Sequence, residues 1–280
     1  MILEAGLADA YGAGFEFADA NDILVYNTLK EYRKHPRYAS IYGTYTDDTQ
    51  MAIAITELIL ETKEWSKLSI ADKFVEVFKR DPRKGYSSRF YTILEQVSSG
   101  KELLEVLHPN SNRNGAAMRS YPIGIYKRED VILEKSEQQA IITHNTKEGI
   151  LSSKIIALAA HYFLYKKGSK KHLIEYLEVT LSQHFDFIRT STLKMEALPT
   201  VNTVIALILD HKSMSSCLIE AVDLGGDTDT VASLSLAILS LCKDTIYDLP
   251  NWLYKDFKND TFGKDYLIEL DNKLSNKLIE

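Results

Sequence analysis

Apolar residues recur at helical spacing through most of the 280-residue chain, and this pattern limits the fold more than any other feature. Side chains three or four positions apart share one face of an α-helix, which can then be buried against its neighbours. Only six prolines occur, at places where helices would begin or end. The pattern predicts an all-α protein with helices over 50–62, 69–80, 87–97, 100–107, 149–166, 170–184, 201–210, 214–224 and 230–242.

We expect one compact domain spanning residues 1–280. The length is compatible with one or two domains, but the polar motifs whose side chains should meet are spread along the whole chain. Beyond Asp256, Lys, Asp and Glu alternate with scattered Leu. That composition predicts a surface helix without a catalytic role.

Two short segments are rich in side-chain oxygen atoms, and each precedes an apolar helical stretch. Residues 45–49 read YTDDT, and residues 221–230 read AVDLGGDTDT. Carboxylates and hydroxyls are hard oxygen ligands, which suit Mg²⁺, Mn²⁺ or Ca²⁺ and disfavour Zn²⁺. Together the two segments predict one divalent-metal site at a pair of helix N-termini.

Helix capping is the alternative interpretation of each segment. Asp and Thr are preferred N-cap residues, and acids in the first turn complement the helix dipole. One cap needs one side chain, however, whereas each segment offers at least three oxygen ligands. Four aspartates from two segments would also repel each other unless cations lay between them. The redundancy favours metal binding, with which capping by the same loops is compatible.

Five ordered motifs between Gly6 and Ala232 resemble those of the ADP-ribosylglycohydrolase family. Two of them are the oxygen-rich segments. The others are GLADAYGAGFE at 6–16, NGAAMR at 114–119 with the PIG that follows at 122–124, and Thr143-His144, which resembles a Thr-His pair that opens a helix. The chain departs from the family pattern at Ala8, where Gly is usual, and in the helix after the last motif, which is usually Gly-rich. Residues 85–110 show no family feature, which leaves the acceptor open.

The resemblance implies a compact orthogonal helical domain around a central dinuclear site for two Mg²⁺ ions, or Mn²⁺. It assigns the metal ligands to Thr46, Asp47, Asp48, Asp227, Asp229 and Thr230. It also implies catalytic roles for Glu16, Asp47, Asp48 and Asp229.

Substrate contacts are expected from Asn114, Gly115, His144, Gly225 and Gly226. A helix cap is the alternative role for His144. Arg119 is expected to be structural, although pairing with a motif acid or a phosphate is a second possibility.

Glu16 follows the Gly-rich run GAGF, which predicts a mobile loop over the site. Taken by itself, the local sequence is also consistent with an ordinary surface glutamate. The histidines other than His144 show no metal-ligand spacing, and none of them is expected to be catalytic.

The implied reaction removes ADP-ribose from a modified protein side chain, with arginine as the first acceptor to consider. Hydrolysis of small ADP-ribose conjugates is one alternative. A non-catalytic ADP-ribose-binding module is another, and the intact acids at Asp47, Asp48, Asp227 and Asp229 argue against it.

The net charge and the cysteine content exclude several classes of protein. With 33 basic and 39 acidic residues the net charge is −6, which argues against general nucleic-acid binding. Two cysteines support no disulfide scaffold, and no secretory signal or membrane span is evident. We therefore expect a cytoplasmic monomer whose partner is an ADP-ribosylated protein or an ADP-ribose conjugate.

Overall fold

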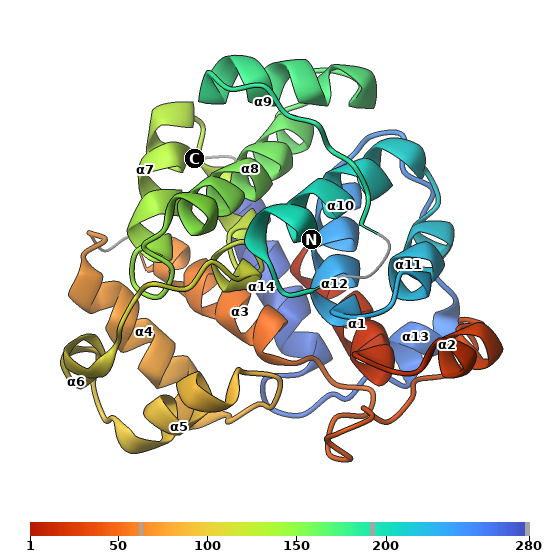
Figure 1. The fold of residues 1–280 in the computed structure, drawn as a ribbon, viewed down its shortest axis with the longest axis horizontal. Helices are drawn as coiled ribbons and strands as arrows, with labels where there is room; N and C mark the ends of the chain where they lie inside the picture. The colour runs from red at the N-terminus through yellow and green to blue at the C-terminus, as the bar shows by residue number, and fades with distance from the viewer. Residues whose placement is uncertain (62–63, 191–193, 278–280) are drawn as a thin grey trace.

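The computed structural model describes residues 1–61, 64–190 and 194–277, and its regular structure within these ranges is helical (Figure 1). In the described ranges, strand pairing is limited to isolated bridges such as that between Asn110 and His144. The α-helices are α1 Ile2–Gly12, α2 Ala20–Tyr26, α3 Asp47–Leu60, α4 Lys67–Arg80, α5 Ser88–Gln96, α6 Gly100–Val106, α7 Glu129–Ala140, α8 Lys147–Leu164, α9 Leu173–Leu181, α10 Ala197–Asp210, α11 Met214–Asp223, α12 Thr228–Leu239, α13 Asn251–Lys255 and α14 Lys264–Lys277. Short 3₁₀ helices are η1 Ala13–Phe15, η2 Asn114–Ala116, η3 Tyr121–Ile125 and η4 Lys170–His172.

The all-α prediction is confirmed, and every predicted helical stretch corresponds to an observed helix. Helices α3 and α12 begin two or three residues earlier than predicted, because the acids of the two oxygen-rich segments belong to their first turns. The stretch 170–184 divides into η4 and α9. Helix α9 ends where Ser182 adopts a left-handed backbone with φ of 51°.

The periodic stretches leave out α1, α2, α7 and α13, and α14 is expected only from the charge pattern of the tail. Helix α7 shows why, since the residues it buries are Ile132, Ser136, Gln139 and Ala140. Half of that face is polar, so it carries no apolar signature. The prediction for the tail needs correction as well. Helix α14 is not only a surface helix, because its Leu267, Leu270 and Leu274 are buried and it packs against α1 and α3.

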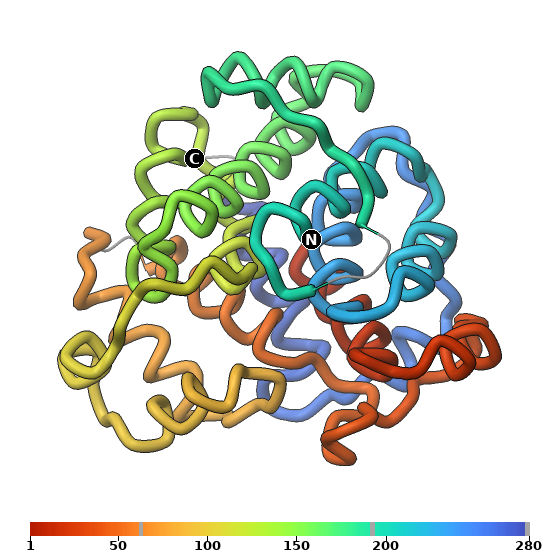
Figure 2. Tube along the Cα trace, in the orientation of Figure 1, coloured from red at the N-terminus to blue at the C-terminus, as the bar shows by residue number. Residues whose placement is uncertain are grey.

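The helices that carry the polar motifs lie at the centre of the molecule. Figure 1 shows α3, α12 and α14 in the middle of the view, with α2, α5, α6 and α9 at the edges. The segment between α2 and α3 runs along the lower edge, as the tube in Figure 2 shows. None of the helices in the described ranges is long and apolar enough to cross a bilayer.

A close backbone approach at the centre joins α1 to the start of α12. Gly12 ends α1, and its carbonyl oxygen accepts a hydrogen bond of 2.8 Å from the Thr228 hydroxyl. A Cβ at Gly12 would lie 2.7 Å from both the Thr228 carbonyl oxygen and the Asp229 Cα. These are backbone atoms that cannot rotate away, so the glycine sets how closely Asp229 approaches α1.

Gly12→Ala should therefore lower the free energy of unfolding by about 1 to 3 kcal/mol, the usual cost of overpacking a filled interior. Urea unfolding measures the change. Gly6→Ala is the matched control in the same helix. Its added Cβ would meet the Leu267 Cδ1 at 2.6 Å, the far end of a side chain that can adjust, and alanine favours the helix. Equal losses in the two variants would contradict the proposed backbone contact.

Candidate metal centre and adjoining cavity

Asp9 fixes the N-terminus of α3 against α1. Its side chain is fully buried, and its carboxylate accepts hydrogen bonds from the backbone N–H groups of Thr46 and Thr49, at 3.0 and 3.1 Å. The Thr49 hydroxyl donates a further bond of 2.6 Å. An acid at this place satisfies N–H groups that the helix itself leaves free, and its charge complements the helix dipole.

The first turn of α3 then directs Asp47 and Asp48 into the interior. Thr46 is the N-cap, and its hydroxyl oxygen accepts a bond of 3.3 Å from the Asp48 N–H. Asp48 Oδ1 is buried and has no hydrogen-bond partner among the described residues. Gly85 lies over Asp47 with φ of 113°, and any Cβ there would collide with Asp47 Oδ1. In this segment the Thr46 hydroxyl caps the helix, while the carboxylates of Asp47 and Asp48 stay available to a ligand.

The second oxygen-rich segment forms a tight turn into α12. Gly225 and Gly226 have φ of 66° and 78°, a left-handed conformation that favours glycine. The turn leads to Asp227, whose Oδ1 accepts a bond of 3.2 Å from the Thr230 hydroxyl. Asp229 Oδ1 accepts one of 3.0 Å from the backbone N–H of Thr230. The first turn of α12 therefore holds both carboxylates at the buried end of the helix.

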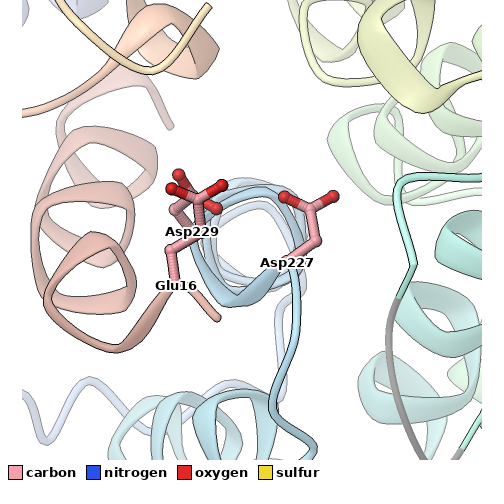
Figure 3. Close-up of side chains that lie close together, drawn as sticks. All are labelled: Glu16, Asp227 and Asp229. Carbon is pink, nitrogen blue, oxygen red and sulfur yellow. The ribbon is translucent and has the colours of Figure 1, made fainter. Parts of the chain in front are cut away.

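Glu16 joins these two aspartates from a different part of the chain. It is buried, and one oxygen each of Glu16, Asp227 and Asp229 lie within 4.8 Å of one another. Figure 3 shows the three carboxylates pointing to the same side of the start of α12. The surface-residue alternative is therefore wrong for Glu16.

The Gly-rich approach to Glu16 is not a loose loop either. Residues 13–15 form the buried helix η1, and a Cβ at Gly14 would lie 2.9 Å from the Arg33 carbonyl oxygen. Glycine serves close packing here, so the observed conformation of the approach differs from the predicted one. Movement of Glu16 stays a prediction.

We call Glu16, Asp47, Asp48, Asp227 and Asp229 the acid cluster. Burial raises the pKa of Asp227 to about 6, and it raises the pKa of Asp47, Asp48 and Asp229 well above the usual range, with repulsion between carboxylates adding to the effect. In the part of the chain that the structure describes, the His35 contact with Glu16 is the one basic partner of this cluster. Within the described ranges no Lys or Arg forms an ion pair with these crowded carboxylates.

The side chains of the acid cluster fit a divalent cation. The donors are hard oxygens, as Mg²⁺ and Mn²⁺ require, and the unpartnered Asp48 Oδ1 is available as a ligand atom. Cations would also relieve the repulsion that raises the carboxylate pKa values. The full ligand set expected from the sequence stays a prediction, since Thr46 is occupied as a cap and is directed to Asp48.

A cavity of about 410 Å³ opens beside the acid cluster. All five acids of the cluster line it, together with four other residues expected from the sequence: Asn114, Gly115, His144 and Thr230. Thr46, Gly225 and Gly226 are not among its lining residues. For the two glycines the structure shows a turn-forming role, and their contact with substrate stays a prediction.

Asn114 holds an acid of the cluster in place. Its side-chain amide donates to Asp227 Oδ2 at 2.5 Å and to the Thr200 hydroxyl at 3.1 Å. Gly115 passes directly beside the His144 ring, where a Cβ would lie 2.7 Å from Cε1. Both residues thus shape the cavity wall as well as lining it.

His144 is not the helix cap that the sequence left open. Thr146 caps α8 by accepting a bond of 3.1 Å from Gly149, and the Thr-His pair lies before the helix and does not open it. His144 is buried and faces the cavity, and burial lowers its pKa to about 3. Arg119 makes the contacts expected of a structural residue, since its guanidinium donates to the Gly115 and Gln139 carbonyl oxygens at 2.7 and 3.1 Å. It also lines the cavity, so a contact with phosphate stays a second possibility.

Sequence reasoning missed Asp9, His35, Gly85 and most of the outer cavity wall. Asp9 carried a usable signal, because an acid within the small and apolar run at residues 5–14 must be buried with partners. No comparable local signal marks His35 or Gly85. The outer wall, from 85–93 and 107–113, includes Tyr86, Arg89, Phe90 and Arg113.

Comparison with known proteins places these features in context. The family model described as ADP-ribosylglycohydrolase matches residues 2–274. Human ADP-ribosylhydrolase ARH3 is 23% identical over 297 residues, covering 83% of this chain and 81% of the human protein. The ADP-ribosyl-(dinitrogen reductase) glycohydrolase of Rhodospirillum rubrum is 25% identical over 271 residues, covering 91% and 88%.

Two further similarities differ in extent. ADP-ribosylhydrolase ARH3 of Xenopus tropicalis is 33% identical over 173 residues, which are 58% of this chain and 49% of the frog protein. A solved structure titled ADP-ribosylglycohydrolase-related protein complex matches with a TM-score of 0.74 and 20% identity, covering 98% of this chain and 96% of that one. The structural match supports the same fold.

The low pKa of His144 gives a test of its burial. Because its folded pKa of about 3 lies below the usual value of 6.5, protonation favours the unfolded chain, and the stability present above pH 6.5 is lost as the pH falls. Between pH 7 and pH 5 this single group should cost about 2 kcal/mol. His144→Gln should remove that part of the acid sensitivity, measured by urea unfolding, while His172→Gln on the exposed surface should not. Identical pH profiles for wild type and His144→Gln would show that the ring is not buried as described.

Proposed function

Because the chain belongs to the ADP-ribosylglycohydrolase family, we propose that it hydrolyses the bond between ADP-ribose and an acceptor group. The observation that carries the proposal is the crowded acid cluster at one end of a cavity of about 410 Å³. That volume lies in the range of small-molecule sites. The human and Rhodospirillum relatives are named for the same type of reaction.

The acid cluster would hold two Mg²⁺ or Mn²⁺ ions, with Asp47 and Asp48 on α3 and Asp227 and Asp229 on α12 as the principal ligands. Thr230, which also lines the cavity, completes the oxygen donors on the second side. Bound cations of this kind bind sugar hydroxyls and lower the pKa of a coordinated water. Two observations support this assignment: all the donor atoms are hard oxygens, and the buried Asp48 Oδ1 has no hydrogen-bond partner among the described residues.

The reaction breaks the bond from the anomeric carbon of ribose to the acceptor atom and joins that carbon to the oxygen of water. In the net change, the acceptor atom gains one proton of the water. Positive charge develops on the sugar as the bond breaks, and nearby carboxylates stabilise it. Glu16 lines the cavity beside Asp227 and Asp229. We therefore expect its carboxylate to hold the bound ribose in position and to accept a proton from water.

The outer part of the cavity suits the rest of ADP-ribose. Arg89 and Arg113 are exposed and line it, and among the described residues neither forms an ion pair. Their guanidinium groups match the diphosphate, whose oxygens accept paired N–H bonds. Phe90 is partly exposed and lines the cavity, so its ring would be available to stack against a base. The anionic ligand would thus place its ribose at the acids and its phosphates at the arginines.

Arginine is the first acceptor that we propose. An ADP-ribosylated arginine keeps a cationic guanidinium next to the scissile bond, and five carboxylates around two divalent cations keep one net negative charge that attracts it. The test is incubation with arginine-linked, serine-linked and small ADP-ribose conjugates in Mg²⁺, Mn²⁺ or EDTA, with detection of free ADP-ribose. We expect release from the arginine conjugate that EDTA abolishes. Release of ADP-ribose from the serine-linked or small conjugate alone would show that arginine is not the acceptor. No release from any conjugate would contradict the proposed hydrolysis.

Asp48→Asn and Asp229→Asn should each lower the turnover number at least a hundredfold in Mg²⁺, because each removes an anionic ligand while keeping the side-chain size. Relief of the repulsion should leave the melting temperature without metal unchanged or higher. Asp244→Asn, on the exposed surface, is the matched control and should behave as wild type. Wild-type rates in both site variants would exclude the metal assignment, and a lower melting temperature with normal rates would indicate a capping role alone.

Mg²⁺ and ADP-ribose should stabilise the protein together more than the sum of their separate effects. The physical reason is that ribose hydroxyls complete the shells of the cations, so each ligand binds more tightly to the native state when the other is present. Thermal unfolding with each ligand alone and with both measures the coupling. Strictly additive shifts would argue against contact between ribose and metal, and Asp227→Ala should abolish the shift with Mg²⁺.

A further inference from the structure

We propose that His35 is a positioning residue that holds the Glu16 carboxylate against the acid cluster. The inference rests on the proposed function for its catalytic consequence, but its structural part stands on observed contacts. The imidazole is completely buried, and His35 Nε2 contacts Glu16 Oε2. His35 lies in the segment between α2 and α3, which Figure 2 shows along the lower edge of the molecule.

The other ring nitrogen determines which atom donates. His35 Nδ1 accepts hydrogen bonds from the backbone N–H groups of Arg37 and Tyr38, at 2.9 and 3.2 Å. A nitrogen that accepts from N–H groups carries no proton, so the ring proton lies on Nε2. His35 Nε2 therefore donates to Glu16 Oε2, and the loop backbone imposes this tautomer.

The loop that carries His35 is itself anchored. The His35 N–H donates to the Ile41 carbonyl oxygen at 3.0 Å, and the ring centroid lies 5.0 Å from that of Tyr38. Three residues earlier, the buried Tyr32 donates its hydroxyl to the Leu253 carbonyl oxygen at 2.7 Å. These contacts fix the loop, so the His35 ring that donates to Glu16 is held in place.

Glu16 is fixed at its backbone as well. The next residue, Phe17, has a left-handed φ of 52°, which is unusual for a non-glycine residue. Its N–H donates at 2.8 Å to the carbonyl oxygen of Gly226, in the turn that leads to Asp227. The backbone is therefore tied to the second oxygen-rich segment, and the side chain is tied to His35.

This arrangement addresses the repulsion within the cluster. Glu16, Asp227 and Asp229 place carboxylate oxygens within 4.8 Å of one another, so Glu16 would be driven away in the absence of a cation. The fixed N–H donor of His35, in contact with Glu16 Oε2, offsets that repulsion. His35 then keeps Glu16 in the position from which it acts, before metal and ribose arrive.

Two substitutions at His35 separate the effect of its hydrogen-bond donor from the effect of its side-chain volume. His35→Leu keeps an apolar volume but removes the donor, whereas His35→Gln keeps an N–H at a comparable distance from the backbone. With the arginine-linked substrate, we expect His35→Leu to lower kcat at least tenfold and to change KM less than threefold. His35→Gln should recover most of the rate. In the Glu16→Gln background, His35→Leu should have little further effect, because both changes disrupt the same interaction.

Crystal structures of metal-free wild type, His35→Leu and His35→Gln decide the proposal without reference to activity. We expect the Glu16 carboxylate to leave the neighbourhood of Asp227 and Asp229 in His35→Leu alone. An unmoved Glu16 in that variant, or a normal kcat with it, would overturn the positioning role. Absence of ADP-ribose release by wild type would instead overturn the proposed reaction, and the three structures would still decide whether His35 positions Glu16.

Discussion

Repulsion between buried carboxylates shapes the centre of this protein. Five acids converge where two helices begin, and within the described residues His35 is the one basic side chain that forms an ion-pair contact with them. The fold compensates with fixed dipoles and hydrogen bonds: the N-termini of α3 and α12 face the acids, Asn114 donates to Asp227, and the Thr230 N–H donates to Asp229. These contacts leave most of the negative charge in place, and we propose that divalent cations balance it.

The helical frame explains how residues so distant in sequence meet. Asp9 on α1 holds the start of α3, while Gly12 at the end of the same helix contacts the start of α12. One helix therefore sets the position of both oxygen-rich segments. The segment after η1 adds Glu16, tied through Phe17 to the turn at Gly226 and through His35 to the loop before α3. Loss of any of these contacts would therefore shift the position of the acids.

Sequence reasoning recovered the features that have a local signature. Helical periodicity identified most of the apolar helices but not α1, and the redundancy of oxygen ligands identified Asp47, Asp48, Asp227 and Asp229, which all line one cavity. It failed where burial is polar, as on α7, and where a role depends on tertiary contact. His35 shows the limit most clearly, because its partner is 19 positions away and nothing in its neighbourhood indicates that they meet. The glycines before Glu16 were misinterpreted, since the same residue type serves a flexible loop and a close packing contact.

We propose that the acid cluster is a binding site for divalent cations and not a set of helix caps. Anomalous diffraction from a crystal grown with Mn²⁺ distinguishes the two. We expect strong anomalous peaks between the carboxylates of α3 and those of α12, with Asp48 and Asp229 among the contacting residues. A well-ordered structure at high Mn²⁺ concentration with no peak among these acids would contradict it.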